Sequence, residues 1–366
     1  MANGYCPNLM QHIKVLADMN DPSVKITPMG FLAMLKQAQP QIQLTSPQGA
    51  TRNLTLKYRK RSVVALTKTS DTCDLDSRPL YLEQNIETTL FRKFSFMVED
   101  ADIRRYCEDA QSSVAIGGLP TPFMQEHLML MLTQINGLLQ GVNQDLVTAQ
   151  ATKFGVNAVS GLSTSTTVNF NDDSTVNLVT EGFTKLLTDY QVNEGMGTPH
   201  LVGSGILHSL MLQKAATGMG ISGINQAILA QGMAFHYDPY AATGWGANQF
   251  GVFTPGSCGL IEADKFVGGF SGRKGASEFG NIELPLVGNA TDGINVPTLS
   301  FDIQLRYIDC PTEETEAYEG DITVNRGWQI ILSKNYGLWN QPSDAFYSGD
   351  RLAGNNGSLR YTATNA

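Results

Sequence analysis

The feature that most constrains this chain is a long helical pattern over residues 121–155. Apolar residues recur there at steps of three and four, which gives one apolar stripe along the whole segment: Leu128, Met131, Leu132, Ile135, Leu138, Leu139, Val142, Leu146 and Ala149. Thr121 is a candidate N-cap, Pro122 suits the first turn, and Gly155 can end the helix. A helix of about thirty residues is roughly 45 Å long, far above the usual mean of about 11–12 residues. The pattern predicts a spine for the fold.

The composition indicates a chain whose surface is largely covered by other chains. The 366 residues are 42% apolar and only 16% charged, whereas about 25% charged residues are usual. A chain of this length buries roughly three quarters of its unfolded surface without disulfides. The net charge of −9 argues against a protein whose main task is to coat nucleic acid.

The cysteines and the hydropathy favour an intracellular chain without a membrane span. Cysteines are few, odd in number and scattered, which indicates reduced thiols: Cys6, Cys73, Cys107, Cys258 and Cys310. The first residues lack the basic and apolar regions of a signal peptide, and no run of 18 apolar residues occurs. The three glycosylation sequons, at Asn53, Asn289 and Asn356, are therefore expected to be chance matches.

Residues 1–82 are predicted to form an N-terminal arm followed by a long extended hairpin. Prolines interrupt residues 1–43, where one amphipathic helix over residues 29–39 is expected and the remainder has no core of its own. Residues 52–68 alternate between apolar and polar side chains and are flanked by turn-forming sequences, which predicts strands of a long hairpin. This hairpin has too few apolar residues to be stable alone, so we expect it to lie on another surface.

The remaining elements predict a mixed α+β chain. Strands are expected at residues 91–98, 199–203, 233–237, 297–310 and 321–340, and helices at 180–193, 204–216 and 223–231. The Ser/Thr/Asn-rich residues 156–180 are expected to form a loop or a hairpin. The acidic residues 311–321 are expected to form a solvated loop.

A glycine motif raises the possibility of a dinucleotide-binding enzyme. Gly218, Gly220 and Gly223 are spaced G-x-G-x-x-G, and Asp238 follows at a suitable distance. That motif requires a preceding β-strand. The residues before Gly218 have helical spacing instead, so we expect these glycines to link two helices.

Other catalytic patterns are missing from the sequence. The histidines show no metal-ligand spacing, and neither a G-x-S-x-G elbow nor a Walker-type phosphate loop occurs. We therefore expect no enzyme and no catalytic, cofactor or metal site. The basic run at residues 57–61 (KYRKR) could bind phosphate, but we favour a polar edge that meets acidic residues on a neighbouring chain.

The order of these elements resembles the major capsid proteins of tailed bacteriophages, which have the HK97-like fold. The resemblance implies an N-terminal arm at residues 1–43 and an extended loop at 44–82. It implies a peripheral domain at residues 83–195 and 298–366, with the spine helix in it, and an axial domain at 196–297. The glycine-rich residues 243–280 would line the centre of a ring.

That resemblance implies a structural protein that self-assembles as hexamers and pentamers into an icosahedral shell enclosing double-stranded DNA. Expected partners are other copies, a portal, and scaffolding or cement proteins; DNA would be enclosed without sequence-specific binding. The expected location is the virion, after assembly in the host cytoplasm, with no membrane. An encapsulin-type nanocompartment is the alternative, and a dinucleotide-binding enzyme a more distant one.

Contacts between subunits take the place of catalytic residues in this interpretation. The basic candidates are Lys57, Arg59, Lys60 and Arg61, and the acidic candidates are Glu99, Asp100 and Asp102. Some members of the family cross-link their subunits through a lysine and an asparagine. Neither partner of such a bond can be matched in this sequence.

Overall fold

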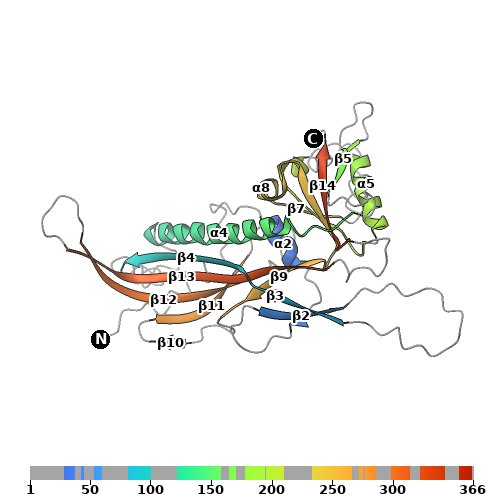
Figure 1. Ribbon diagram of the computed structural model, residues 1–366. Coiled ribbons are helices and arrows are strands. Elements are labelled where there is room, and N and C mark those ends of the chain that lie inside the picture. Colours follow the sequence, from blue (N-terminus) through green and yellow to red (C-terminus); the bar gives the residue numbers. More distant parts are fainter. Residues whose placement is uncertain are drawn as a thin grey trace, which may run out of the picture. The chain divides into compact units, whose positions relative to one another are not determined.

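The computed structural model describes residues 29–37, 43–44, 53–59, 81–99, 122–157, 165–169, 178–193, 195–209, 233–265, 272–274, 277–285, 298–313, 322–342 and 354–364. These residues form two compact units (Figure 1). The first takes in the described parts of Leu90–Gly141 and Glu262–Asn335. The second takes in the described parts of Pro28–Thr89, Val142–Ile261 and Tyr336–Ala366.

The first unit is built on a sheet with the strand order β10-β11-β12-β13-β4, in which β9 also pairs with β13. The strands are β4 (Leu90–Glu99), β9 (Cys258–Ala263), β10 (Gly272–Lys274), β11 (Ser277–Pro285), β12 (Thr298–Glu313) and β13 (Ile322–Asn340). The strands expected at 91–98, 297–310 and 321–340 are therefore confirmed, and β12 extends three residues beyond its expected end. Strand β12 continues through Pro311 to Glu313, so the solvated loop expected at 311–321 was placed too early.

Alternation along β12 and β13 separates a buried face of the sheet from a more open one. Phe301, Ile303 and Leu305 are buried, as are Ile330 and Leu332 of the paired strand. On the other face of β12 the side chains become more open along the strand, from the buried Asp302 through the half-buried Gln304 to the exposed Arg306. An antiparallel sheet with one face on the core produces this period of two.

Helix α4 (Pro122–Gln150) is the long helix expected from the sequence, 29 residues in length. It ends at Gln150 rather than at Gly155. Gly155 packs against Asn356, and a Cβ added to this glycine would lie 2.5 Å from the Asn356 side chain. Within the first unit, an added Cβ at Gly141 of α4 would lie 3.4 Å from the Arg92 guanidinium of β4. The helix therefore lies on the side of the sheet to which Arg92 points.

The second unit contains a sheet with the order β5-β14-β8-β6-β7. Its strands are β5 (Ser165–Asn169), β6 (His200–Gly203), β7 (Ala234–Tyr237), β8 (Gln249–Phe253) and β14 (Ser358–Thr364). Strands β6 and β7 confirm two expected strands. Strand β5 pairs in parallel with the distant β14, so the loop or hairpin expected at 156–180 was wrong for these residues.

Helix α5 (Leu178–Val192) confirms the helix expected at 180–193 and covers part of that sheet. Its apolar stripe joins the buried residues of β5, β6, β8 and β14 in one core: Phe183, Leu186, Tyr190, Val168, Leu201, Phe250, Val252, Leu359 and Tyr361. At roughly 1.5–3 kcal/mol for each fully buried large apolar side chain, this cluster is a principal stabiliser of the second unit.

Helix α2 (Gly30–Gln37) differs from the amphipathic helix that residues 29–39 were expected to form. The residues from Gly30 to Leu35 are all buried. The Phe31 ring packs against the rings of Trp245 and Phe253, with centroid distances of 5.7 and 5.5 Å. Trp245 ends the short helix α8 (Ala241–Trp245). A helix that is apolar all round belongs inside a core, so this part of the arm is a core element of the second unit.

Part of the glycine-rich region predicted from the sequence lies outside the described residues. Gly218, Gly220 and Gly223 lie there, as does the whole helix expected at 223–231. Of the helix expected at 204–216, residues 205–209 are described and are helical. None of the described helices is long and apolar enough to cross a membrane. The division into arm, extended loop, peripheral domain and axial domain stays a prediction.

Candidate functional site

A small three-stranded sheet in the second unit corresponds to the extended hairpin expected from the sequence. Strands β1 (Gln43–Leu44), β2 (Asn53–Arg59) and β3 (Tyr81–Glu87) are antiparallel, in that order. Strand β2 confirms the first part of the strand pattern expected at residues 52–68. Its partner β3 lies at residues 81–87, beyond the segment in which the sequence placed both strands of the hairpin. The short β1 adds a third strand that the sequence pattern did not indicate.

One apolar cluster attaches this sheet to the rest of the second unit. Leu56 and Tyr58 of β2 pack with Ile261 and Trp339, and the half-buried Ile86 joins them. The rings of Tyr58 and Trp339 are 5.8 Å apart, and the Trp339 Nε1–H donates to Gln84 Oε1 at 3.1 Å. Because few residues take part, the sheet gains little stability of its own from burial.

The candidate contact residues have different places in the structure. Lys57 lies opposite Glu83 in the register, and its Nζ is 2.9 Å from Glu83 Oε1 in a largely exposed pair. Lys57 thus has an acidic partner within its own chain. Arg59 ends β2 and Glu99 ends β4, while Lys60, Arg61, Asp100 and Asp102 lie outside the described residues. Lys57 is the one candidate whose side chain the structure describes, and it lies beside an oppositely charged residue.

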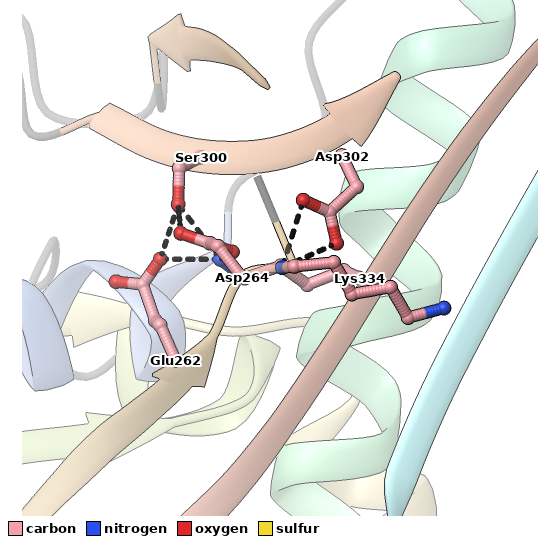
Figure 2. A network of polar contacts seen from close by, with 6 residues as sticks. Glu262, Asp264, Ser300, Asp302 and Lys334 are labelled. Carbon is pink, nitrogen blue, oxygen red and sulfur yellow. Dashed lines mark hydrogen bonds and ion pairs between the residues drawn. The ribbon is translucent and has the colours of Figure 1, made fainter. Parts of the chain in front are cut away.

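The most heavily bonded polar group of the first unit is the buried Lys334, on β13 (Figure 2). Its Nζ donates to Glu262 Oε2 at 2.6 Å, to Asp264 Oδ1 at 2.7 Å and to Ser300 Oγ at 2.8 Å. The Ser300 hydroxyl is also within hydrogen-bonding distance of both carboxylates. Close by, the backbone N–H of Lys265 donates to both Asp302 oxygens at 3.1 Å.

This arrangement holds an ammonium ion rather than preparing a nucleophile. All three N–H bonds of Lys334 have acceptors, and two of those acceptors are carboxylates. The Lys334 side chain is fully buried, whereas those of Glu262 and Asp264 are 20% and 18% exposed. The two carboxylates therefore keep some hydration. The group ties β9, β12 and β13 together.

Asp238, the acidic residue that the dinucleotide interpretation would use, has a structural role. Its Oδ2 accepts hydrogen bonds from the Phe31 N–H and from Asn143 Nδ2, both at 2.8 Å, and its Oδ1 accepts one from the Tyr240 N–H at 2.9 Å. Asn143 Oδ1 in turn accepts from the Leu32 N–H at 3.0 Å. Burial raises the pKa of Asp238, and these N–H donors oppose the rise. The carboxylate caps α2 and has no oxygen left for a ribose.

Two histidines on neighbouring strands form a second polar group in the second unit. His200 Nδ1 and His236 Nε2 are 2.9 Å apart, and the rings stack with centroids at 5.2 Å. Burial, with the neighbouring His200, lowers the pKa of His236 to about 3, and burial also lowers the pKa of His200. One ring must donate and the other accept, so the pair is neutral near pH 7.

No reaction centre emerges from the described residues. They contain no group of three or more His, Cys, Asp or Glu side chains placed to hold a metal ion. The thiol of Cys258 is buried, and burial raises its pKa to about 12, so it is not a thiolate at neutral pH. The polar groups of the described residues are braces and caps.

Sequence reasoning missed the Lys334 group, although one signal was present. Ile330, Leu332, Tyr336 and Leu338 occupy alternate positions of β13 and are buried, and Lys334 occupies the position between them. A lysine at an inward position of an alternating strand predicts a buried partner. Which acids would supply it could not be read from the sequence, because Glu262 and Asp264 lie on another strand.

Three solved structures from phages, two of them cyanophage capsids, match most of the chain, each with a TM-score below 0.5. The cyanophage A-1(L) capsid has a TM-score of 0.49 and 11% identity, over 94% of this chain and 95% of that one. A structure of Mycobacterium phage Adephagia has a TM-score of 0.44 and 9% identity, over 95% and 94%. The cyanophage P-SCSP1u capsid has a TM-score of 0.41 and 11% identity, over 90% and 87%. No protein-family model and no curated protein matches the sequence.

Proposed function

We propose that this chain is the major capsid protein of a tailed phage, a structural protein that forms a closed shell around double-stranded DNA. In this proposal copies of the chain assemble as hexamers and pentamers with the HK97-like division into arm, extended loop, peripheral domain and axial domain. Portal, scaffolding or cement proteins complete the particle, which forms in the host cytoplasm and becomes the virion.

The three-stranded sheet β1-β2-β3 is the observation that carries the proposal. It is held by one small apolar cluster, and the outer edge of β3 has no strand partner among the described residues. Such a sheet is marginal in isolation, and an unpaired edge invites pairing with another chain. A neighbouring copy that covers it would supply the missing burial.

Composition supports the same proposal. Only 16% of the residues are charged, and the cores of protein interfaces are depleted in charged residues. The net charge of −9 suits a wall that encloses DNA without holding it tightly. The proposed contacts between copies are Lys57, Arg59, Lys60 and Arg61 on one side and Glu99, Asp100 and Asp102 on the other.

Negative-stain electron microscopy of the purified chain, with light scattering on the same sample, tests the proposal. Closed shells, tubes or rings of five or six copies are the expected result. The same sample is incubated with a purified scaffolding protein where one is known from the same genome. A chain that stays monomeric or dimeric under both conditions would contradict the proposal. Dinucleotide binding by that small species would favour an enzyme instead.

A further inference from the structure

The open face of the six-stranded sheet in the first unit carries exposed basic and aromatic residues. Phe91 on β4 is 48% exposed, and its neighbours at alternate positions, Lys93 and Ser95, are also exposed. Arg92, between Phe91 and Lys93, points to the side on which α4 lies. This face is therefore opposite to α4.

Two contacts place Arg306 on the same face as Phe91. Lys265 Nζ lies 5.9 Å from the centroid of the Phe91 ring, and the N–H of the same residue donates to Asp302. Arg306 follows Asp302 by four residues along β12, so the two share a face. Lys93, Lys265 and Arg306 are all exposed there.

The register extends this basic character across the sheet. Lys274, Ser277, Arg306 and Gln329 stand opposite one another on β10, β11, β12 and β13 and form one cross-strand row. Adjacent strands are about 4.8 Å apart, so the row is roughly 15 Å wide. We call Phe91, Lys93, Lys265, Lys274 and Arg306 the basic face.

Acidic residues near the basic face are already engaged or lie further along the strands. Asp302 is buried and accepts from the Lys265 N–H, and Glu262 and Asp264 bind Lys334. Glu283 lies opposite Ser300, six residues and about 20 Å along the sheet from Arg306. Glu99 is six residues beyond Lys93 on β4. Among the residues that the structure describes, the surface around Arg306 is thus net positive, in a chain whose net charge is −9.

The positive charge of the basic face is complementary to an acidic partner, and two of its residues, Phe91 and Arg306, are of kinds found often at protein interfaces. Aromatic residues and arginine are enriched at protein–protein interfaces. The most acidic stretch of this chain is residues 313–321, which contain Glu313, Glu314, Glu316, Glu319 and Asp321 and no lysine or arginine. This segment connects the paired ends of β12 and β13.

The chain cannot place this segment on its own basic face. Glu313 lies seven residues beyond Arg306 on β12, a distance of about 23 Å along an extended strand. A connection of eight residues that starts at Glu313 and returns to its partner Ile322 reaches at most about 15 Å from them. Lys265 bonds to Asp302, eleven residues and about 36 Å from Glu313 along β12. The segment of the same chain cannot reach that part of the basic face even with its side chains extended, so a second copy must supply it there.

We propose that the basic face binds the acidic segment, residues 313–321, of a second copy of this chain. The inference rests on the proposed function, because it names one contact through which copies of the shell protein associate. Each copy gives an acidic segment and receives one, so the contact is heterologous and can close into a ring.

Charge reversal in two places tests this contact. Lys93→Glu with Arg306→Glu reverses the basic face, and Glu314→Lys with Glu316→Lys reverses the segment. Each pair places like charges opposite one another, so each is expected to raise the concentration needed for assembly by about tenfold or more. All four changes in one chain, or an equimolar mixture of the two variants, should restore assembly. Lys185→Glu, an exposed lysine of the second unit, is the control and should assemble normally.

Carbodiimide cross-linking of a mixture of ¹⁴N- and ¹⁵N-labelled chains identifies the residues in contact. Cross-linked peptides that join residues 313–321 to Lys93, Lys265 or Lys274 are expected, with one label from each chain. This measurement needs only association at high concentration. Circular dichroism and thermal unfolding check that each variant is folded.

The outcomes separate this contact from the proposed function. Wild-type protein that never assembles, even in the microscopy experiment, contradicts the capsid proposal, whatever the cross-links are. Normal assembly of both reversed variants, or the absence of mixed-label cross-links in assembled wild-type protein, overturns the contact alone. A third outcome would also overturn the contact. The wild-type protein would bind duplex DNA in a salt-dependent way, Lys93→Glu/Arg306→Glu would not, and no mixed-label cross-links would form. The basic face would then be assigned to DNA.

Discussion

Lys334 shows how one residue can organise a sheet. Its ammonium group is buried and bound by Glu262, Asp264 and Ser300. An ion pair in the interior contributes little net stability compared with apolar residues of the same volume. Loss of its acceptors is much more costly, because a charge is then left buried without compensation.

The double variant Glu262→Ala/Asp264→Ala is expected to lower the free energy of unfolding by about 3–5 kcal/mol. Lys334→Met should cost less, because the two carboxylates that remain are partly exposed and can hydrate. Denaturant unfolding measures both variants. The exposed pair provides the control, and Glu83→Ala should cost less than about 1 kcal/mol. A larger loss for Lys334→Met than for the double variant would contradict this account.

The histidine pair predicts a loss of stability in mild acid. The pKa of His236 is lowered from 6.5 to about 3, so between these values the folded protein binds fewer protons than the unfolded chain. Stability is then lost as the pH falls from about 6.5 towards 3, by up to about 1.4 kcal/mol per pH unit for one proton. The raised pKa values of Asp189 and Asp238 act in the opposite direction.

A comparison of variants isolates the contribution of His236. His236→Gln removes the titrating group while leaving an amide that can bond to His200. Denaturant unfolding measures the free energy of unfolding of both proteins from pH 7.5 to 4.5. As the pH falls, the wild type should lose stability relative to His236→Gln. His208→Gln, at a histidine outside the pair, is the matched control for a histidine-to-glutamine substitution. Parallel curves for wild type and His236→Gln would refute the assignment.

At the scale of elements, two glycines in helices are expected to respond in opposite ways to substitution. A Cβ at Gly30 of α2 would lie 2.4 Å from the Tyr237 carbonyl oxygen, whereas one at Gly137 of α4 would meet nothing within 4 Å. Gly30→Ala should therefore displace α2 and destabilise the second unit by several kcal/mol. Gly137→Ala should stabilise the chain by about 0.5–1 kcal/mol, because alanine favours the helix. Thermal unfolding measures both, and equal effects would contradict the packing described for α2.

The elements also show what can be predicted from one sequence. Helix α4, helix α5 and strands β12 and β13 were predictable because their apolar residues keep one period over many residues. Strand β5 was not predictable, because its polar residues Ser165 to Asn169 become a strand only by pairing with β14, almost two hundred residues away. The burial of α2 was hidden for a similar reason. Its partners Trp245 and Phe253 are distant in the sequence.

The candidate site was less predictable than the fold. The basic run at residues 57–61 was visible, but the register that places Glu83 opposite Lys57 was not. The buried acceptors of Lys334 and the cap formed by Asp238 depend on contacts between strands and helices that share no local pattern. Contacts between copies depend on a second chain, which the periodicity of one chain does not encode.

At the scale of the whole molecule, reversal of the basic run should affect assembly and spare the fold. Arg59→Glu/Lys60→Glu/Arg61→Glu changes charges that lie beyond the Lys57–Glu83 pair, so circular dichroism and thermal unfolding should match wild type. Light scattering should detect fewer and smaller assemblies, because the proposed acidic partners on the neighbouring copy would meet like charge. Lys185→Glu again serves as the control. Normal particles from the triple variant would remove these residues from the contact.

The position of β14 has a consequence for the time course of synthesis. Strand β14 lies between β5 and β8, and β5 pairs with no other strand of the described sheet. The ribosome adds about 5–20 residues per second, and β14 follows β8 by about a hundred residues. The flank of β8 that β14 later covers therefore stays open for roughly 5–20 s in every nascent chain. Several ribosomes translate one messenger RNA, so nascent chains with an open β8 edge lie close together. Slower translation between β8 and β14 should therefore increase the association of these nascent chains with one another.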